Sequence, residues 1–365
     1  MNSSTFKFSA IFAAVTAALM VSACGGGGGG SSDSGSANNG GGNNGGGGNV
    51  STCSNGASDY PACTQLPLQT AVPAATYPAN SIELQAFTEL NAVRQKLGLG
   101  LLAQNTQLDL AAKNHANYIS LNYLRDASVF GHSENSNYSG FTGNSPGDRG
   151  KYAGFTSGVG EVIASTNTQS NLTPTYDLLN TVSHAQGLLD QCSTKVGISY
   201  APLLANGTII NPVVYNYGAL SNSQGFTLCQ RNGDSFTYTY PFDGQLNIAT
   251  SMAGEVPNPI PDLPKDQFGG NDWINGTSAP IIIGFEKSKS IDSISATVTE
   301  IPSNAILPMR LLWWNSVTYP NPYKDKYIAF LVGFKPFKSQ TKYQVSYTAT
   351  VGGNNVTKQF SFTTK

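Results

Sequence analysis

Apolar residues in the middle of the chain recur at the spacing of amphipathic helices. One helix should follow Asn80 or Ser81, either of which can cap it, and should end at Gly98. A second helix is predicted over about Thr106–Leu121. A third should open with Thr173-Pro174, a capping residue followed by a first-turn proline. The apolar positions of this third helix are Leu178, Leu179, Val182 and Leu188.

Strand patterns follow these helices. Residues 196–201 and 208–219 are rich in Ile, Val and Tyr and predict strands, so the helical region should fold as an α/β layer structure. Further along, apolar positions alternate over residues 343–351, and Gly352-Gly353-Asn354-Asn355 then marks a turn. About 100 residues with such alternation predict an all-β sandwich. Thr341–Val345 resembles a strand of immunoglobulin-like (Ig-like) or fibronectin-like bacterial modules.

Two segments break both periodicities and separate the expected domains. Residues 24–50 are almost entirely Gly, Asn and Ser, which predicts a flexible tether. Residues 231–265 include the proline-rich run Gly254–Pro264, which predicts an extended linker. The expected folded parts are an N-terminal extension over 51–77, an α/β domain over 78–230 and an Ig-like β-sandwich over 266–365.

The N-terminus has the pattern of an exported lipoprotein. Lys7 precedes an apolar run, Phe8–Met20, which is too short to span a bilayer as a helix and predicts a signal peptide over residues 1–23. The run ends in Val21-Ser22-Ala23-Cys24, which resembles the lipobox of bacterial lipoproteins. The resemblance implies cleavage before Cys24, acylation of this residue with palmitate-type chains, and attachment to a membrane. Because the next residue is Gly25 rather than Asp, it implies the outer membrane or the cell surface.

Charge and cysteine content restrict the function further. The formal net charge is -1 and charged residues make up 11% of the chain, well below the roughly 25% of typical soluble domains. No basic surface is therefore expected for nucleic acid. Four cysteines remain besides Cys24, and in an exported chain they predict disulfides rather than a catalytic thiol. Three pairings are possible, of which short loop closure favours Cys53–Cys63 and Cys192–Cys229.

Histidines and carboxylates point to a site in the α/β domain. His132 lies in Gly131-His132-Ser133-Glu134, Glu161 follows in Gly160-Glu161-Val162-Ile163, and His184 follows Ser183. Imidazoles with a carboxylate are the inventory of a metal site or of a general acid–base site.

Other polar residues of this region have structural interpretations. His115 lies on a helix face with alanines and is expected to be a hydrogen-bonded structural histidine. Asp148-Arg149 is expected to form a structural ion pair, and Asn91 and Arg94 are expected to brace loops.

Several short motifs occur in an order that resembles one known family. They are Leu90-Asn91-Ala92-Val93-Arg94, Ala111-Ala112-Lys113-Asn114-His115-Ala116-Asn117-Tyr118, Gly131-His132-Ser133-Glu134, Gly140-Phe141-Thr142-Gly143, Asp148-Arg149, Gly160-Glu161-Val162-Ile163 and Ser183-His184. The series resembles the bacterial branch of the CAP superfamily, which comprises cysteine-rich secretory proteins, antigen 5 and plant pathogenesis-related proteins. The match covers roughly residues 80–220 and implies a CAP-type α-β-α sandwich.

The resemblance also implies a large central cleft with two histidines and acidic residues, which in some members binds a divalent metal. His132 matches the first cleft histidine, Glu161 the glutamate of the Gly-Glu motif, and His184 the second histidine. Zn²⁺ or another divalent cation would then be held by His132 and His184. The fourth cleft residue is open between Asp177, two turns before His184 on one helix face, and Glu134.

Three functions are compatible with these expectations. The favoured one is a lipid-anchored module at the cell envelope, whose cleft binds an envelope lipid, a sterol or a wall-derived ligand. The alternative is a metal-dependent hydrolase of peptides or esters, in which Glu161 or Glu134 is the catalytic carboxylate. The third is adhesion through the β-sandwich.

Overall fold

A computed structural model describes residues 65–167, 173–222, 225, 227–255, 259–260, 276–316 and 325–365. The predicted signal peptide, the tether, and Cys24, Cys53 and Cys63 lie outside the described residues. In the described part of the chain, no helix is long and apolar enough to cross a membrane.

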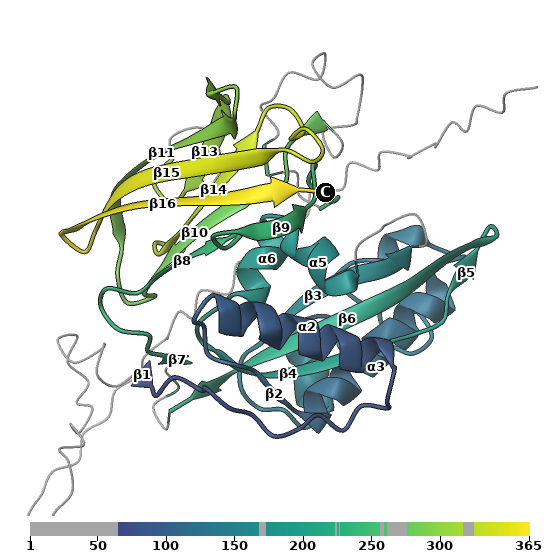
Figure 1. Cartoon of the computed structure of the whole chain (residues 1–365). Helices are drawn as coiled ribbons and strands as arrows, with labels where there is room; N and C mark the ends of the chain where they lie inside the picture. Colours follow the sequence, from purple (N-terminus) through teal and green to yellow (C-terminus); the bar gives the residue numbers. More distant parts are fainter. Residues whose placement is uncertain are drawn as a thin grey trace, which may run out of the picture. The chain divides into compact units, whose positions relative to one another are not determined.

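The α/β domain is built on one mixed seven-stranded sheet (Figure 1). Its strands run in the order β1-β7-β6-β4-β2, and β3 and β5 each pair with the long strand β6. The bounds are β1 (Gln65–Leu66), β2 (Ala103–Gln104), β3 (Val159–Asn167), β4 (Ser193–Tyr200), β5 (Leu204–Ala205), β6 (Thr208–Ser221) and β7 (Thr227–Gln230). Strand β1 shows that the predicted N-terminal extension takes part in this sheet.

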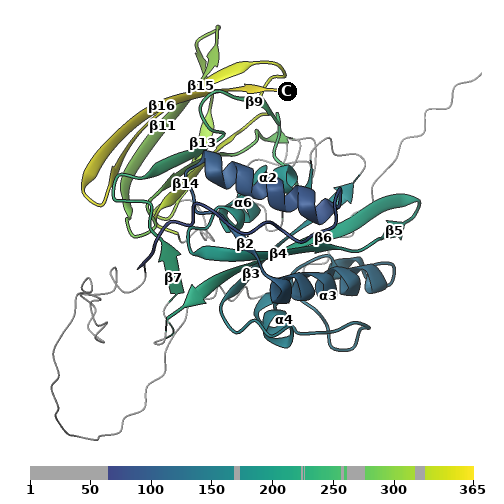
Figure 2. The same ribbon diagram turned by 60° about the horizontal axis from the view of Figure 1, so that its bottom comes forward.

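Helices cover both faces of the sheet (Figure 2). One face packs against α2 (Ile82–Lys96), α5 (Pro174–Leu179) and α6 (Ser183–Leu188), and the other against α3 (Thr106–Asn122), with η1 (Ala127–Val129) and α4 (Pro146–Tyr152) beside it. The side chains of β3 alternate between the two faces of the sheet, so the strand contributes to the cores on both sides. Val162 packs with α2, and Ile163 packs with α3. The predicted α-β-α sandwich is confirmed.

The first two predicted helices are confirmed. Ser81 caps α2 by accepting the N–H of Leu84 at 3.1 Å, and Gly98 follows the helix with φ +71°. Helix α3 packs unusually close to β4, because a Cβ on Gly197 would lie 2.1 Å from the backbone nitrogen of Asp109. A glycine is therefore required where the helix crosses the strand.

The third predicted helix is wrong as a single element, because the chain forms two short helices, α5 and α6, with a corner between them. At this corner the Thr181 hydroxyl donates to the Leu178 carbonyl at 2.8 Å. The amide of Asn180 donates to the Ser251 carbonyl at 2.7 Å, and the Asn180 carbonyl accepts the Ala253 N–H at 2.9 Å. A segment more than 70 residues away thus holds the corner, which helical spacing alone does not reveal.

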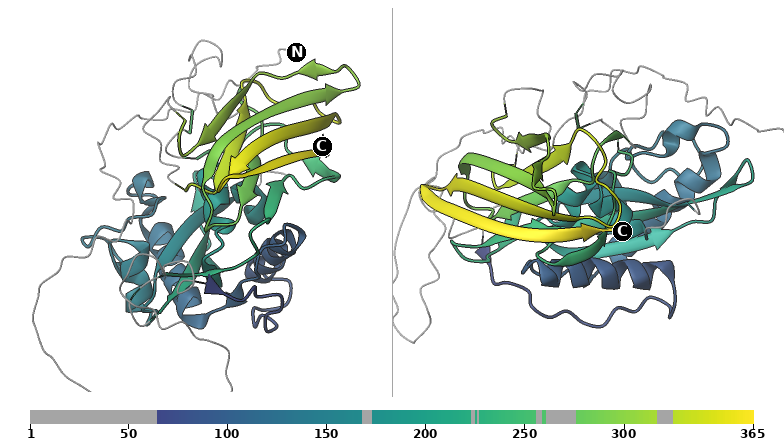
Figure 3. Two further views of the ribbon diagram at one scale, coloured as in Figure 1. Left: turned by 90° about the vertical axis from the view of Figure 1, so that its left-hand side faces the viewer. Right: turned by 45° about the horizontal axis from the view of Figure 1, so that its top comes forward.

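The C-terminal part is a β-sandwich, as predicted. A four-stranded sheet runs in the order β13-β14-β10-β8, and a five-stranded sheet in the order β12-β11-β15-β16-β9. Figure 3 shows the long β15–β16 hairpin in yellow, closed by Gly352 and Gly353, both at positive φ. The bounds are β8 (Thr237–Tyr240), β9 (Gln245–Ile248), β10 (Ile281–Phe285), β11 (Ile291–Ile301), β12 (Ala305–Ile306), β13 (Met309–Trp313), β14 (Ile328–Gly333), β15 (Lys342–Val351) and β16 (Asn354–Thr364).

The predicted linker over residues 231–265 is wrong in part. Strand β8 pairs with β10 in one sheet of the sandwich, and β9 pairs with β16 in the other. Each strand has only four residues, too few for an alternation to stand out, and its partner lies far away in the sequence. The sandwich therefore begins near residue 237.

The four-stranded sheet is buried on both faces. In β10, Ile281 and Ile283 pack into the core between the two sheets, whereas Ile282 packs into the core that contains α2, α5 and α6. In β14, Leu331 packs between the two sheets, and Phe330 packs into the core that contains α2, α5 and α6. The two domains therefore share one hydrophobic core along this sheet.

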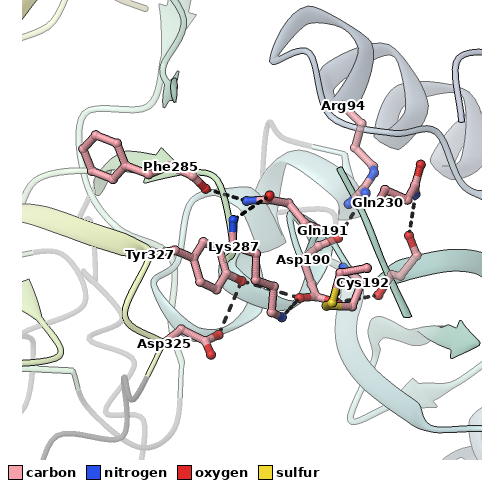
Figure 4. Close-up of a disulfide and its surroundings, with 11 residues drawn as sticks. Arg94, Asp190, Gln191, Cys192, Gln230, Phe285, Lys287, Asp325 and Tyr327 are labelled. Atoms are coloured by element: carbon pink, nitrogen blue, oxygen red, sulfur yellow. Dashed lines mark hydrogen bonds and ion pairs between the residues drawn. A yellow bond between two sulfur atoms is a disulfide. The ribbon is translucent and has the colours of Figure 1, made fainter. Parts of the chain in front are cut away.

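Polar contacts add to this junction (Figure 4). The side chain of Gln191 donates to the Phe285 carbonyl at 2.7 Å and accepts the N–H of Lys287 at 3.0 Å. The Lys287 ammonium also forms an ion pair with Asp190. Beside these residues the predicted disulfide between Cys192 and Cys229 is present, and it joins the start of β4 to β7.

Candidate functional site

Glu161 lies at the centre of a buried polar network on the edge strand β3. Among the described strands, β3 pairs only with β6, so its other edge is open to loops and helices. The side chain of Glu161 points to the α3 side of the sheet. Asn216 is its partner on the neighbouring strand β6 and points to the same side. With its amide nitrogen facing the carboxylate, Asn216 donates to Oε2 at 3.1 Å.

Arg149, on α4, is the strongest partner of this carboxylate. Its Nη2 lies 2.8 Å from Oε1 and 2.9 Å from Oε2 of Glu161, and both side chains are fully buried. His132 adds a third contact, with Nδ1 at 3.1 Å from Oε1. Burial alone would raise the pKa of Glu161, but the electrostatic interactions with His115 and Arg149 and the hydrogen bond from His132 outweigh it and lower the pKa to about 2. Glu161 is therefore a carboxylate at neutral pH.

Glu134 and His115 form the second half of the network. Nδ1 of His115 lies 2.9 Å from Oε1 of Glu134, and Nε2 lies 2.8 Å from the Gly131 carbonyl. Oε2 of Glu134 accepts the N–H of Thr142 at 2.7 Å and that of Gly143 at 3.3 Å. His115 is fully buried with both ring nitrogens bonded, so its predicted structural role agrees with the geometry.

His132 and His184 come together at the edge of this network. Their ring centroids are 6.4 Å apart, and their side chains are 47% and 16% exposed. These values set them apart from Glu134, Glu161 and His115, whose side chains have no exposed surface. The two imidazoles are thus the part of the site that an external ligand can reach.

The hydrogen bonds define which nitrogen each histidine offers. Because Glu161 is ionised, Nδ1 of His132 donates to it, and Nε2 is the ring nitrogen that makes no bond to the described residues. The Thr181 hydroxyl gives its proton to Leu178, so at 3.2 Å it accepts from Nδ1 of His184. Burial and the neighbouring His132 lower the pKa of His184 to about 4, so its Nε2 keeps a lone pair at neutral pH. The site therefore presents two imidazole Nε2 atoms.

Two sequence interpretations require correction. Arg149 pairs with Glu161, and Asp148 instead completes a capping box with Ser145 at the start of α4. Asp177 lies on α5 and His184 on α6, so the single helix face that would align them does not exist.

Asn91 and Arg94 do brace loops, as predicted. Asn91 forms hydrogen bonds with the backbone of Leu102. Arg94 donates to three carbonyls, those of Gly100, Leu188 and Asp190.

Sequence reasoning missed Glu255. This residue lies in the proline-rich segment after β9, yet its side chain is fully buried against the start of α6. Its carboxylate accepts the N–H of Val182 at 2.9 Å and that of Ser183 at 2.8 Å, and it lies 3.9 Å from Nδ1 of His184. Burial raises its pKa to about 7, although these N–H groups act in the opposite direction. The only sequence signal was an acidic residue inside an apolar, proline-rich run.

The site fits a metal only through the histidine pair. Within the described residues, no group of three or more His, Cys, Asp or Glu side chains is arranged to hold a metal ion. Both oxygens of Glu161 and of Glu134 already accept protein hydrogen bonds. A divalent cation at His132 and His184 would therefore need water for its remaining ligands.

The same geometry limits acid–base chemistry. A general base must be reachable by a substrate and have a pKa near the working pH. Glu161 is buried with a pKa of about 2, and Glu134 is buried with both oxygens bonded. A substrate can reach neither buried carboxylate, so the geometry does not favour the hydrolase.

Comparison with known proteins identifies the family of the α-β-α domain. Residues 87–215 match the model of the cysteine-rich secretory protein family, CAP. No curated protein matches the chain. The α-β-α domain is therefore a CAP domain, followed by the β-sandwich.

Two solved structures are similar to parts of the chain. One is an extracellular protein containing an SCP domain from Bacillus anthracis, with 19% identity and a TM-score of 0.30 over 40% of this chain. The chain spans only 45% of the length of that protein. The other is an outer surface protein from Borrelia burgdorferi, with 20% identity and a TM-score of 0.30 over 40% of this chain and 97% of its own.

Proposed function

We propose that this CAP-domain protein is an exported binding module, and that His132 and His184 are its ligand contacts. The observation that carries the proposal is that each histidine uses Nδ1 for a bond within the protein and keeps Nε2 for a ligand. Two imidazole nitrogens at one place suit a divalent transition metal such as Zn²⁺, or a ligand that donates two hydrogen bonds. An envelope lipid, sterol or wall-derived molecule with hydroxyl groups belongs to the second class.

Zinc titration tests this proposal directly. The double change His132→Ala with His184→Ala should abolish Zn²⁺ binding measured by calorimetry, because it removes both nitrogen ligands. Each single change should weaken binding by more than the 10- to 100-fold typical of residues that only orient a metal ligand. Ca²⁺ should not compete, because it prefers oxygen ligands.

Two results would contradict the zinc proposal. An unchanged signal in the double variant would place Zn²⁺ elsewhere on the protein. No signal in the wild type would exclude the metal and leave only the hydrogen-bonding ligand. The variants should fold normally, because neither ring belongs to a hydrophobic core.

We further propose that Cys24 anchors the module to the outer membrane or cell surface through acyl chains. Two or more chains make membrane attachment stable, whereas one is marginal. Cys24→Ser should therefore move the protein from the membrane fraction to the soluble fraction after cell fractionation. Retention of the variant in the membrane fraction would show that another segment provides the anchor.

A further inference from the structure

The corner between α5 and α6 is held by the segment of residues 251–255, which follows the first strands of the β-sandwich. The Ser251 carbonyl and the Ala253 N–H form hydrogen bonds with Asn180, the residue that directly follows α5. Met252 lies between them, 1% exposed, in the core shared with α5 and α6. The segment is therefore built into the CAP domain and does not pass over its surface.

Glu255 ends this segment at the residues that precede His184. Its two oxygens accept the N–H groups of Val182 and Ser183, which have no partner within α6 because they begin the helix. The same carboxylate lies 3.9 Å from Nδ1 of His184, the nitrogen that donates to Thr181. Glu255 thus contacts both the backbone that carries His184 and the protonated side of its ring.

We propose that Glu255 is the positioning residue of His184, and that it takes the place of the second acidic residue that the sequence assigned to Asp177 or Glu134. By binding the N–H groups at the first turn of α6, Glu255 fixes the position of the His184 imidazole. With an oxygen 3.9 Å from Nδ1, too far for a hydrogen bond, its negative charge favours a proton on Nδ1, which also donates to Thr181, and so favours the tautomer that leaves Nε2 free. The proposal rests on the binding role of His184 put forward above.

The position of Glu255 in the sequence gives this proposal a further consequence. Glu255 lies 40 residues beyond the end of the segment that matches the CAP family, residues 87–215. The CAP segment alone therefore lacks one part of its own binding site. Ligand binding at His132 and His184 should stabilise the packing of residues 251–255 against the corner between α5 and α6. That packing should in turn strengthen ligand binding, because coupling between two equilibria is reciprocal.

The test uses the full chain and reads the histidine directly. The chain has three histidines, so nitrogen NMR of the imidazoles gives three sets of signals, and the His184→Ala variant assigns one of them. In the wild type, His184 should show the Nδ1–H tautomer. In Glu255→Ala it should lose this single tautomer, and Zn²⁺ affinity should fall by about 10- to 100-fold. Glu255→Gln, which can still accept one of the two N–H groups, should give an intermediate result.

Glu286→Gln is the matched control. Glu286 is also a buried glutamate, 3% exposed, which accepts a backbone N–H, that of Asn232 at 2.9 Å. This variant should leave the His184 tautomer and Zn²⁺ affinity unchanged even if it lowers the melting temperature. Asp177→Asn should do the same, because the residue lies on a different helix.

The outcomes separate this proposal from the proposed function. An unchanged His184 tautomer in both Glu255 variants overturns the positioning role, whatever happens to Zn²⁺. A changed tautomer in a protein whose wild type binds no Zn²⁺ supports the positioning role and rejects the metal. If Glu255→Ala does not fold, Glu255→Gln alone decides, since it keeps the shape of the side chain.

Discussion

Deletion of residues 233–365 should leave the CAP domain unable to fold cooperatively. The fragment would lose the face of the four-stranded sheet that completes the core around α2, α5 and α6. The lost side chains include Tyr238, Ile282, Phe330 and Val332. Exposing such a face removes several buried side chains, each worth roughly 1.5–3 kcal/mol. That sum is comparable to the total stability of a typical domain, about 5–15 kcal/mol.

Denaturation with two probes measures this prediction. The fluorescence of Trp313, the last residue of β13, and of Trp314 reports on the sandwich, whereas the histidine NMR signals report on the CAP domain. Leu90→Ala changes only α2, at a fully buried position, and should cost about 2–5 kcal/mol. If the two domains unfold together, the tryptophan transition should shift by the same amount as the histidine signals.

Two results would contradict the dependence of each domain on the other. If the unfolding transition monitored by tryptophan fluorescence does not shift in Leu90→Ala, the sandwich unfolds independently. A stable 65–232 fragment with native histidine signals would show that the shared sheet is dispensable. The matched change on the solvent side, Leu246→Ala at a position 65% exposed, should leave both transitions within about 0.5 kcal/mol.

Loss of Arg149 should give the second large effect. Arg149→Leu removes the two hydrogen-bond contacts from Nη2 to Glu161, and it leaves both buried carboxylates, Glu161 and Glu134, without their nearby guanidinium charge. Breaking one member of a buried pair typically costs 3–5 kcal/mol, because the remaining charge is uncompensated. Adding Glu161→Gln to Arg149→Leu should recover part of the loss, since the neutral amide needs no counter-charge. Urea unfolding of the two single variants and the double variant measures the coupling, and strict additivity would contradict it.

The same network should set the acid stability of the protein. The folded-state pKa of Glu161 is about 2 against an ordinary value of 4.5. A depressed pKa stabilises the fold above pH 4.5, and this contribution is lost as the pH falls toward 2. At 1.36 kcal/mol for each pKa unit, the loss is about 3 kcal/mol. Glu161→Gln should lack this component, so its stability should fall less steeply between pH 4.5 and 2 than that of the wild type.

The sequence by itself determined the local elements and the main members of the site. The spacing of apolar residues located α2, α3, β4, β6 and the β15–β16 hairpin, because such spacing reflects the geometry of the element in which each residue lies. Resemblance to the CAP family selected His132, Glu161 and His184, and the structure brings them together. One disulfide, Cys192–Cys229, also followed from the sequence, because short loop closure favours this pairing among the possible ones.

Only the tertiary structure decided how these parts are connected. Arg149, rather than a neighbour in sequence, neutralises Glu161 because α4 packs beside β3, and sequence order does not encode that packing. The third helix breaks at Asn180 because residues 251–253 bond there. Glu255 reaches His184 across 71 positions, and β10 is buried on both faces by two cores. Each of these features depends on a contact between distant segments, and a local pattern of apolar and polar residues carries no information about which distant segment will supply the partner.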